Sequence, residues 1–118
     1  MAADAFADDE PAEARFDDLI HAPTRLSIVS LLAATEWADF KYLRDAAGLS
    51  DSALSKQLTT LEEAGYVDIR KGFVGKRPRT SVRLSAAGRR AFAEHVAALQ
   101  EIVARSGLTV VPASEIMR

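Results

Sequence analysis

The sequence has 118 residues, with 15 Lys and Arg against 17 Asp and Glu, so its formal net charge is −2. This length corresponds to one domain with one core and leaves no room for a two-lobed enzyme. The absence of cysteine excludes disulfides, thiolate zinc sites and cysteine nucleophiles, and is typical of a cytoplasmic protein. The acidic N-terminus does not resemble a signal peptide, and no apolar run is long enough to span a membrane, so we expect no membrane partner.

The charges are unevenly distributed along the chain. Residues 1–20 contain seven acids and one base, whereas residues 66–90 contain eight bases and one acid. A local excess of basic residues attracts a polyanion whatever the total charge of the protein. A solvated charged face is the plainer interpretation, so the charge run needs support from the fold.

The N-terminal half is predicted to be helical. We expect residues 1–14, which are rich in alanine and acids, to form a disordered acidic tail. A short helix should precede Ala22, and a second helix should run from Pro23 to about Ala34, because proline suits the first turn of a helix. Trp37 and Phe40 follow in a short connection, and we expect both to pack in the core.

Two further helices are predicted on either side of a tight turn. The first covers about 40–47 and stops at Gly48, and Ser50 is a good N-cap for the second, over 51–64. The second helix carries leucines at i, i+4 and i+7, which predict one buried stripe: Leu54, Leu58 and Leu61.

The residue pattern then changes to a period of two. Residues 66–71 and 79–84 alternate apolar with basic or polar positions, which predicts two strands. Gly72 to Pro78 lies between them and contains two glycines and a proline, which predicts a hairpin loop. Each strand therefore has one apolar face and one basic or polar face.

A last long helix is predicted over about 86–105, capped by Ser85 and followed by a C-terminal tail over 107–118. Its apolar surface exceeds what a small domain needs for its own core. We therefore predict that this helix and the short segment 15–20 form a homodimer interface. The residues of this predicted interface are Phe16, Leu19, Ile20, Phe92, Val96, Leu99, Ile102 and Val103. His95 borders the same stripe, where a subunit interface would make association sensitive to pH.

This order of elements is typical of a helix-turn-helix followed by a basic hairpin. The second helix of such a motif lies in the DNA major groove, and short polar side chains opposite its apolar stripe can reach bases and phosphates. The predicted contacts from this helix are Ser50, Ser52, Ser55, Lys56, Gln57, Thr59 and Thr60. The hairpin can lie on the DNA backbone or enter the minor groove. Its predicted contacts are Arg70, Lys71, Lys76, Arg77 and Arg79.

The segments Leu49–Leu58 and Leu61–Val67, together with a hairpin that ends in the pattern Leu84–Gly88, resemble the MarR/ArsR-type winged helix-turn-helix transcriptional regulators. The resemblance spans roughly residues 16–95. It implies a mainly α fold with a small β-hairpin wing (α+β), and a winged-helix domain over 15–106. It also implies a homodimeric regulator that binds double-stranded DNA sequence-specifically, and we expect it to act as a repressor.

Other classes of function have little support in the sequence. His21 and His95 form no ligand-spaced pair, and the cysteine clusters of metal-sensing relatives are missing, so we expect no metal and no cofactor. Phosphate-binding glycine loops, nucleophile elbows and paired carboxylates are also missing, which argues against an enzyme. A small-molecule effector is compatible with the resemblance but has no support here. Two alternatives stay open: a winged-helix protein-interaction module and a non-specific architectural DNA-binding protein.

Overall fold

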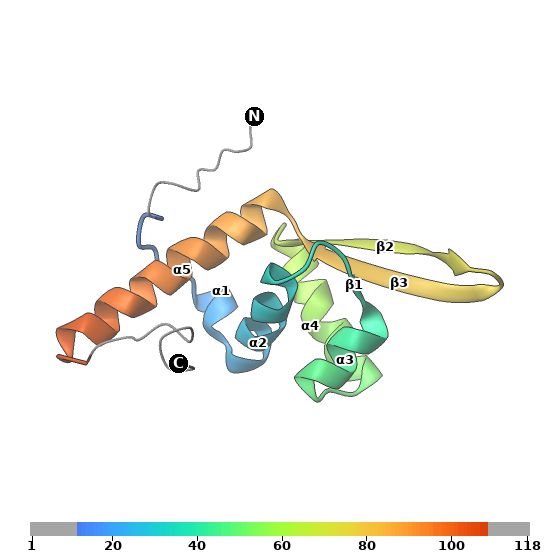
Figure 1. Ribbon diagram of the computed structural model, residues 1–118, viewed down its shortest axis with the longest axis horizontal. Helices are drawn as coiled ribbons and strands as arrows, with labels where there is room; N and C mark the ends of the chain where they lie inside the picture. The colour runs from blue at the N-terminus through green and yellow to red at the C-terminus, as the bar shows by residue number, and fades with distance from the viewer. Residues whose placement is uncertain (1–11, 109–118) are drawn as a thin grey trace, which may run out of the picture.

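The computed structural model describes residues 12–108, in which a two-stranded ribbon projects from a group of helices (Figure 1). The elements in chain order are α1 (Asp18–His21), α2 (Pro23–Ala33), β1 (Ala38–Asp39), α3 (Phe40–Ala47), α4 (Asp51–Glu63), β2 (Val67–Val74), β3 (Arg77–Leu84) and α5 (Ala86–Arg105). The α+β winged-helix architecture expected from the sequence is confirmed. The predicted tails, 1–14 and 107–118, fall largely outside the described residues.

The helix ends lie at the capping residues that the sequence indicates. The hydroxyl of Ser50 accepts a hydrogen bond from the N–H of Ala53 over 3.1 Å, and that of Ser85 accepts one from the N–H of Gly88 over 3.0 Å. Gly48 ends α3 with a left-handed φ of 69°, a conformation that glycine adopts without strain. The turn between α3 and α4 is therefore fixed at both of its ends.

One apolar core lies between the helices and the inner face of the sheet. The leucine stripe of α4 is buried in it, as predicted, so the polar side of α4 is turned to solvent. The other buried members come from α2, β1, α3 and the hairpin: Ile28, Val29, Leu32, Ala38, Leu43, Val67, Val82 and Leu84.

The sheet has the strand order β1-β3-β2 and is antiparallel throughout. We call β2, β3 and the turn between them the wing. The predicted seven-residue loop is wrong, because the ladder continues to the pair Val74–Arg77 and closes through a two-residue turn. Gly75 takes a left-handed φ of 64° in this turn, as hairpin turns require. Pro78 is tolerated in β3 because it lies beyond β1, where the strand has a partner on one side only.

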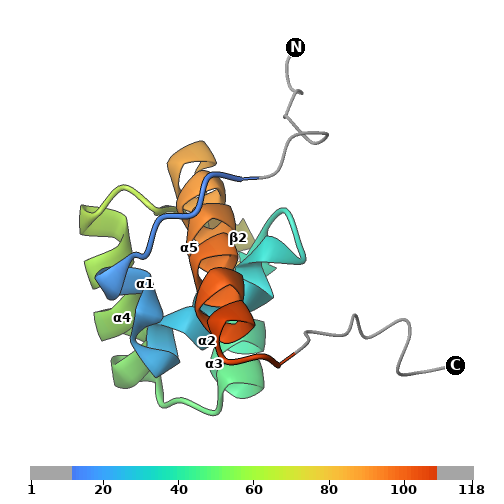
Figure 2. The ribbon, with the colours of Figure 1, turned by 90° about the vertical axis from the view of Figure 1, so that its left-hand side faces the viewer.

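The segment before α1 runs beside α5 (Figure 2). The N–H of Arg15 donates to the carbonyl of Glu94 over 3.0 Å, and the N–H of Asp17 donates to Nδ1 of His95 over 3.0 Å. His95 is fully buried within this chain, so its side chain presents no surface to a second subunit.

The predicted dimer-interface residues fall into three groups. Ile20 is fully buried and Phe92 packs against the core, so Ile20 cannot contact a partner and its assignment to the interface is corrected. Phe16 and Ile102 are more than 40% exposed. The half-buried members are Leu19, Val96, Leu99 and Val103.

In residues 12–108 we find no helix with the length and apolar character needed to cross a membrane.

Candidate nucleic-acid interface

Most of the residues predicted to contact DNA from α4 lie on its solvent-facing side. The exposed ones are Ser50, Ser52, Ser55, Lys56 and Thr59, whereas Gln57 and Thr60 are half-buried. The hydroxyl of Thr59 donates to the carbonyl of Ser55 over 3.0 Å, and that of Thr60 donates to the carbonyl of Lys56 over 3.3 Å. Because these hydroxyl protons are used inside the helix, the two threonines offer a partner their oxygen lone pairs and methyl groups.

Gln57 is held in place by a residue that the sequence analysis missed. Nη1 of Arg25, on α2, donates to Oε1 of Gln57 over 3.0 Å, while Nε of Arg25 donates to the carbonyl of Leu19 over 2.6 Å. Arg25 therefore holds the amide oxygen of Gln57, and the NH2 group of Gln57 is left to donate a hydrogen bond to a base. Arg25 and Gln57 are 32 positions apart, so no local pattern in the sequence indicates the contact.

The N-terminus of α4 carries a compensated acid. Arg44 pairs with Asp51 over 2.8 Å and with Asp45 over 3.0 Å. The hydrogen bond to Asp51, followed by the one to Asp45, raises the pKa of Arg44 above its ordinary value. Arg44 thereby offsets the negative charge of Asp51 beside a helix N-terminus, whose free N–H groups favour phosphate.

The pleat of the wing divides its basic residues between two faces. The inner face of the wing is defined by Val67, Ile69 and Lys71. Val67 is buried in the core, Ile69 is half-buried, and Lys71, which is paired with Thr80, is exposed nearer the tip. A groove between this face and α4 is lined by Ser55, Thr59, Lys71 and Thr80, together with Phe40, Asp51, Leu58, Glu62 and Ile69. The structure thus brings Lys71 together with the polar side of α4.

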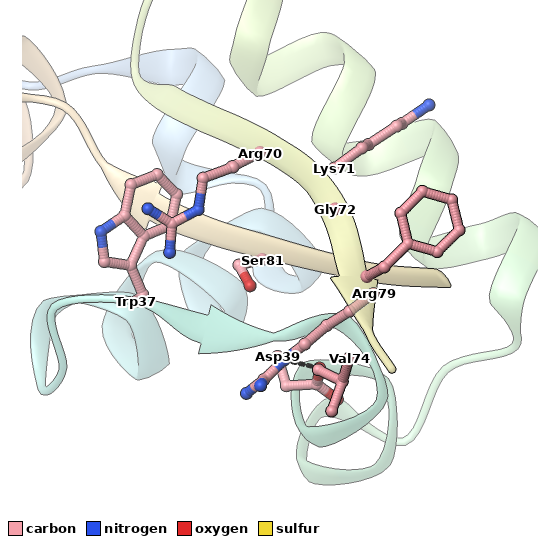
Figure 3. A pocket seen from close by; sticks show the side chains of 9 residues that line it. Trp37, Asp39, Arg70, Lys71, Gly72, Val74, Arg79 and Ser81 are labelled. Carbon is pink, nitrogen blue, oxygen red and sulfur yellow. Dashed lines mark hydrogen bonds and ion pairs between the residues drawn. The ribbon is translucent and has the colours of Figure 1, made fainter. Parts of the chain in front are cut away.

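The other predicted wing contacts lie elsewhere. Arg70 and Arg79 are on the outer face of the wing, which we define by Arg70, Arg79, Ser81 and Arg83, and Nε of Arg79 pairs with Asp39 over 3.2 Å (Figure 3). Lys76 and Arg77 are exposed at the tip. The five wing residues predicted to contact DNA therefore do not lie on one face, because Lys71 is on one side and Arg70 and Arg79 are on the other.

Trp37 also differs from the expectation that it packs in the core. It is half-buried on the outer face, with the guanidinium groups of Arg70 and Arg83 at 4.1 and 4.6 Å from its ring centroid. Cation–π attraction explains this position, because the face of the Trp37 ring attracts the two guanidinium groups, which stay in contact with water on the outer face of the wing. Phe40 does pack against the core, as predicted.

A chain of polar contacts lies behind α4. The hydroxyl of Tyr66, which follows α4, donates to Oδ2 of Asp17 over 2.5 Å. This hydrogen bond, and then burial, raise the pKa of Tyr66 to about 12. Burial, and then the charge of His21, lower the pKa of His95.

Within the described part of the chain, no three His, Asp or Glu side chains are grouped so as to hold a metal ion.

The arrangement of a capped helix-turn-helix and a projecting wing defines a winged-helix DNA-binding module. A family model described as "winged helix DNA-binding domain" matches residues 24–103, and the chain belongs to this family. An uncharacterised protein of Methanocaldococcus jannaschii is 31% identical to it over 78 residues, which are 66% of this chain and 85% of that protein.

Three solved structures show the same fold. A transcriptional regulator homologue from Pyrococcus horikoshii has a TM-score of 0.72 and 24% identity, with 76% of this chain and 89% of that one covered. The homodimeric DNA-binding domain of a possible ArsR-family regulator from Mycobacterium bovis has a TM-score of 0.55 and 26% identity, with coverages of 75% and 74%. The transcriptional repressor BigR from Xylella fastidiosa has a TM-score of 0.54 and 30% identity, with coverages of 71% and 78%. Two MarR-family regulators from Silicibacter pomeroyi share the fold at 21% identity. The winged-helix DNA-binding domain that the sequence resemblance implied is therefore confirmed.

Proposed function

We propose that this protein is a homodimeric transcriptional repressor that binds specific sequences in double-stranded DNA. The observation that carries the proposal is the groove in which Ser55 and Thr59 of α4 face Lys71 and Thr80 of the wing. It places hydrogen-bonding groups and a cation on adjoining elements, as a duplex that contacts both a helix and a wing requires.

In this proposal α4 lies in the major groove and its exposed side chains read base edges. Ser52, Ser55 and Lys56 are free of the core, and Gln57 presents the NH2 group that Arg25 orients. Lys71, Lys76 and Arg77 neutralise backbone phosphates and fix the position of the protein on the duplex. Arg70 and Arg79 stay proposed contacts, which a duplex would reach from the outer side of the wing.

The homodimer is proposed to form along α5. The exposed side chains of Phe16 and Ile102, and the half-buried Leu99 and Val103, supply apolar surface there. The similarity to a homodimeric DNA-binding domain and to a repressor supports these two parts of the proposal. A two-fold dimer would present two copies of α4 about 34–36 Å apart, and bound at a promoter it would exclude the polymerase.

Selection of bound sequences from a random duplex library, with the purified full chain, tests the proposal. We expect a palindromic consensus with half-sites one helical turn apart. Binding at low salt without a consensus would instead indicate an architectural DNA-binding protein. No binding at low salt would overturn the proposal in favour of a protein-interaction module.

The wing has its own test. Lys76→Ala and Arg77→Ala should weaken binding to all sequences alike, and each should reduce the slope of log affinity against log salt by about 0.9. Arg105→Ala, in the last turn of α5, is the matched control and should leave the slope unchanged. Unchanged affinity and slope in both tip variants would show that the wing does not contact phosphates.

A further inference from the structure

The outer face of the wing contains a pocket that DNA reading by α4 does not use. Its volume is about 300 Å³, and its lining includes Trp37, Arg70, Gly72, Arg79 and Ser81 (Figure 3). It is formed where β1, β3 and β2 lie side by side. A pocket of this size is at the lower end of the range for small-molecule sites, which favours a compact ligand.

Ser81 gives the pocket an unused hydrogen-bond donor. This residue of β3 lies between Arg70 of β2 and Asp39 of β1 in the register of the sheet, and its exposed fraction is 9%. Its hydroxyl has no hydrogen-bond partner among residues 12–108, although buried polar groups nearly always have one. The oxygen points into the pocket, so a ligand there would satisfy it (Figure 3).

Two guanidinium groups give the pocket its charge. Arg70 is stacked on Trp37 at 4.1 Å and forms no ion pair within the described chain. Arg79 uses Nε to bind Asp39, which leaves its two NH2 groups without a protein partner in residues 12–108. Asp39 offsets one of these two positive charges, so the pocket keeps a net attraction for anions. Guanidinium groups bind phosphate and carboxylate with paired N–H donors.

Gly72 provides the space for a ligand. It is paired with Arg79 across the ladder and lines the pocket, and a Cβ built on it would meet no atom within 4 Å. Gly72 does not need a left-handed φ, so its lack of a side chain is not explained by the backbone. A glycine inside a strand is typical of a site that another group approaches closely.

We propose that this pocket binds a compact oxyanion, a phosphate or carboxylate group, through the guanidinium groups of Arg70 and Arg79 and the hydroxyl of Ser81. Trp37 holds Arg70 in place for this contact. The oxyanion has two sources: a free small molecule, or a phosphate of bound DNA. The free-anion test needs no DNA, so its result is independent of the proposed regulatory function.

Trp37 is the only tryptophan of the chain, so intrinsic fluorescence reports on the pocket directly. Inorganic phosphate, titrated at constant ionic strength against chloride, should give a saturable change in emission. Gly72→Val fills the pocket, keeps the charge and suits a strand; we expect it to weaken phosphate binding at least tenfold. Arg70→Gln and Ser81→Ala should each weaken it about fivefold or more. Arg90→Gln, on the exposed side of α5 and outside the pocket lining, is the control and should bind phosphate as the parent chain does.

A linear response to phosphate, or a saturable response that persists in Gly72→Val and Ser81→Ala, would overturn the proposal. Circular dichroism checks that each variant is folded. If Gly72→Val does not fold, the phosphate titration of Ser81→Ala still tests the proposal. DNA binding then separates the two sources. A salt slope reduced by about one unit in Arg70→Gln and in Gly72→Val identifies a DNA phosphate, whereas an unchanged slope with DNA affinity that depends on added phosphate identifies a free anion.

Discussion

The backbone N–H of Asp17 donates a hydrogen bond to Nδ1 of His95 over 3.0 Å, and it thereby ties the segment before α1 to α5. Because Nδ1 accepts this bond, the proton of the neutral ring is on Nε2, which lies 3.2 Å from Nδ1 of His21. A second proton on His95 would be on Nδ1, where its N–H would point at the N–H of Asp17 and the hydrogen bond between them would be lost. The ring of Phe16, at 4.7 Å from both imidazoles, limits the access of water that could solvate the charge.

This relationship predicts that the protein loses stability in mild acid. The folded state lowers the pKa of His95, so the unfolded chain, with an ordinary pKa near 6.5, binds a proton first as the pH falls. The contribution of neutral His95 to the free energy of unfolding is complete above about pH 6.5. It decreases as the pH falls below that value and stops decreasing below the pKa of His95 in the folded state. Asp17 and Asp18 face the ring and oppose the shift but do not cancel it.

Urea unfolding at pH 7.5, 6.5 and 5.5 measures this effect. His95→Asn keeps an acceptor near the position of Nδ1 but does not titrate, so the loss between pH 7.5 and 5.5 should be smaller in this variant. Equal losses in the two proteins, or a pKa of His95 above 6.5 in an NMR titration, would contradict the assignment.

Gly88 on α5 is predicted to be intolerant of the smallest side chain. A Cβ there would collide with the backbone carbonyl of Tyr66, which also accepts the N–H of Ser85. Alanine normally stabilises a helix by about 0.5–1 kcal/mol relative to glycine, but here we expect a net loss of about 1–3 kcal/mol in the free energy of unfolding. Gly72→Ala, whose Cβ meets nothing, is the control and should be neutral or slightly stabilising. A stabilised Gly88→Ala protein would refute the close contact.

Arg25 is predicted to influence which sequence is bound without touching phosphate. Arg25→Lys keeps the charge but loses the planar guanidinium that joins Gln57 and the carbonyl of Leu19 in fixed directions, so it should hold Gln57 less firmly. The selected consensus should relax at the base pair that Gln57 reads, while the salt slope stays the same. Arg90→Lys, on the exposed side of α5, should alter neither. An unchanged consensus in Arg25→Lys would show that the orientation of Gln57 does not matter for reading.

A carboxylate on the exposed side of α5 is predicted to disrupt the dimer. Ile102→Glu places a charge on a side chain that is 43% exposed in the single chain and is proposed to be buried between two. Sedimentation at micromolar concentration should give twice the monomer mass for the parent chain and the monomer mass for the variant. Val74→Glu adds the same charge near the wing tip and should stay dimeric. A monomeric parent chain would contradict the proposed homodimer, and a dimeric Ile102→Glu variant would place the interface elsewhere.

The features predicted correctly from the sequence are local ones. Ser50, Gly48 and Ser85 act on their own helix ends, and the leucines of α4 lie on one face by helical spacing alone, so the helix bounds could be derived. Contacts between segments that are far apart in the sequence could not be derived in this way. The contacts of Arg25 with Gln57 and of Asp17 with His95 join residues 32 and 78 positions apart, and no periodicity reports them.

The wing shows a second limit. Gly72 and Pro78 are frequent in loops, so composition predicted a long loop, but strand pairing depends on both strands together. Strand alternation in the sequence shows that Arg79 and Arg83 share a face, but it does not show which face of the wing meets α4, so the separation of Lys71 from Arg70 and Arg79 could not be predicted.

The short turn at Gly75 and Lys76 has a consequence for the energetics of recognition. Since the ladder is paired up to Val74 and Arg77, the ribbon has little conformational freedom to lose when a duplex arrives. The span from its end to α4 is then set before the encounter, and it is the double helix that must adapt its groove widths and bend. Base pairs that no side chain touches would consequently affect affinity through their stiffness.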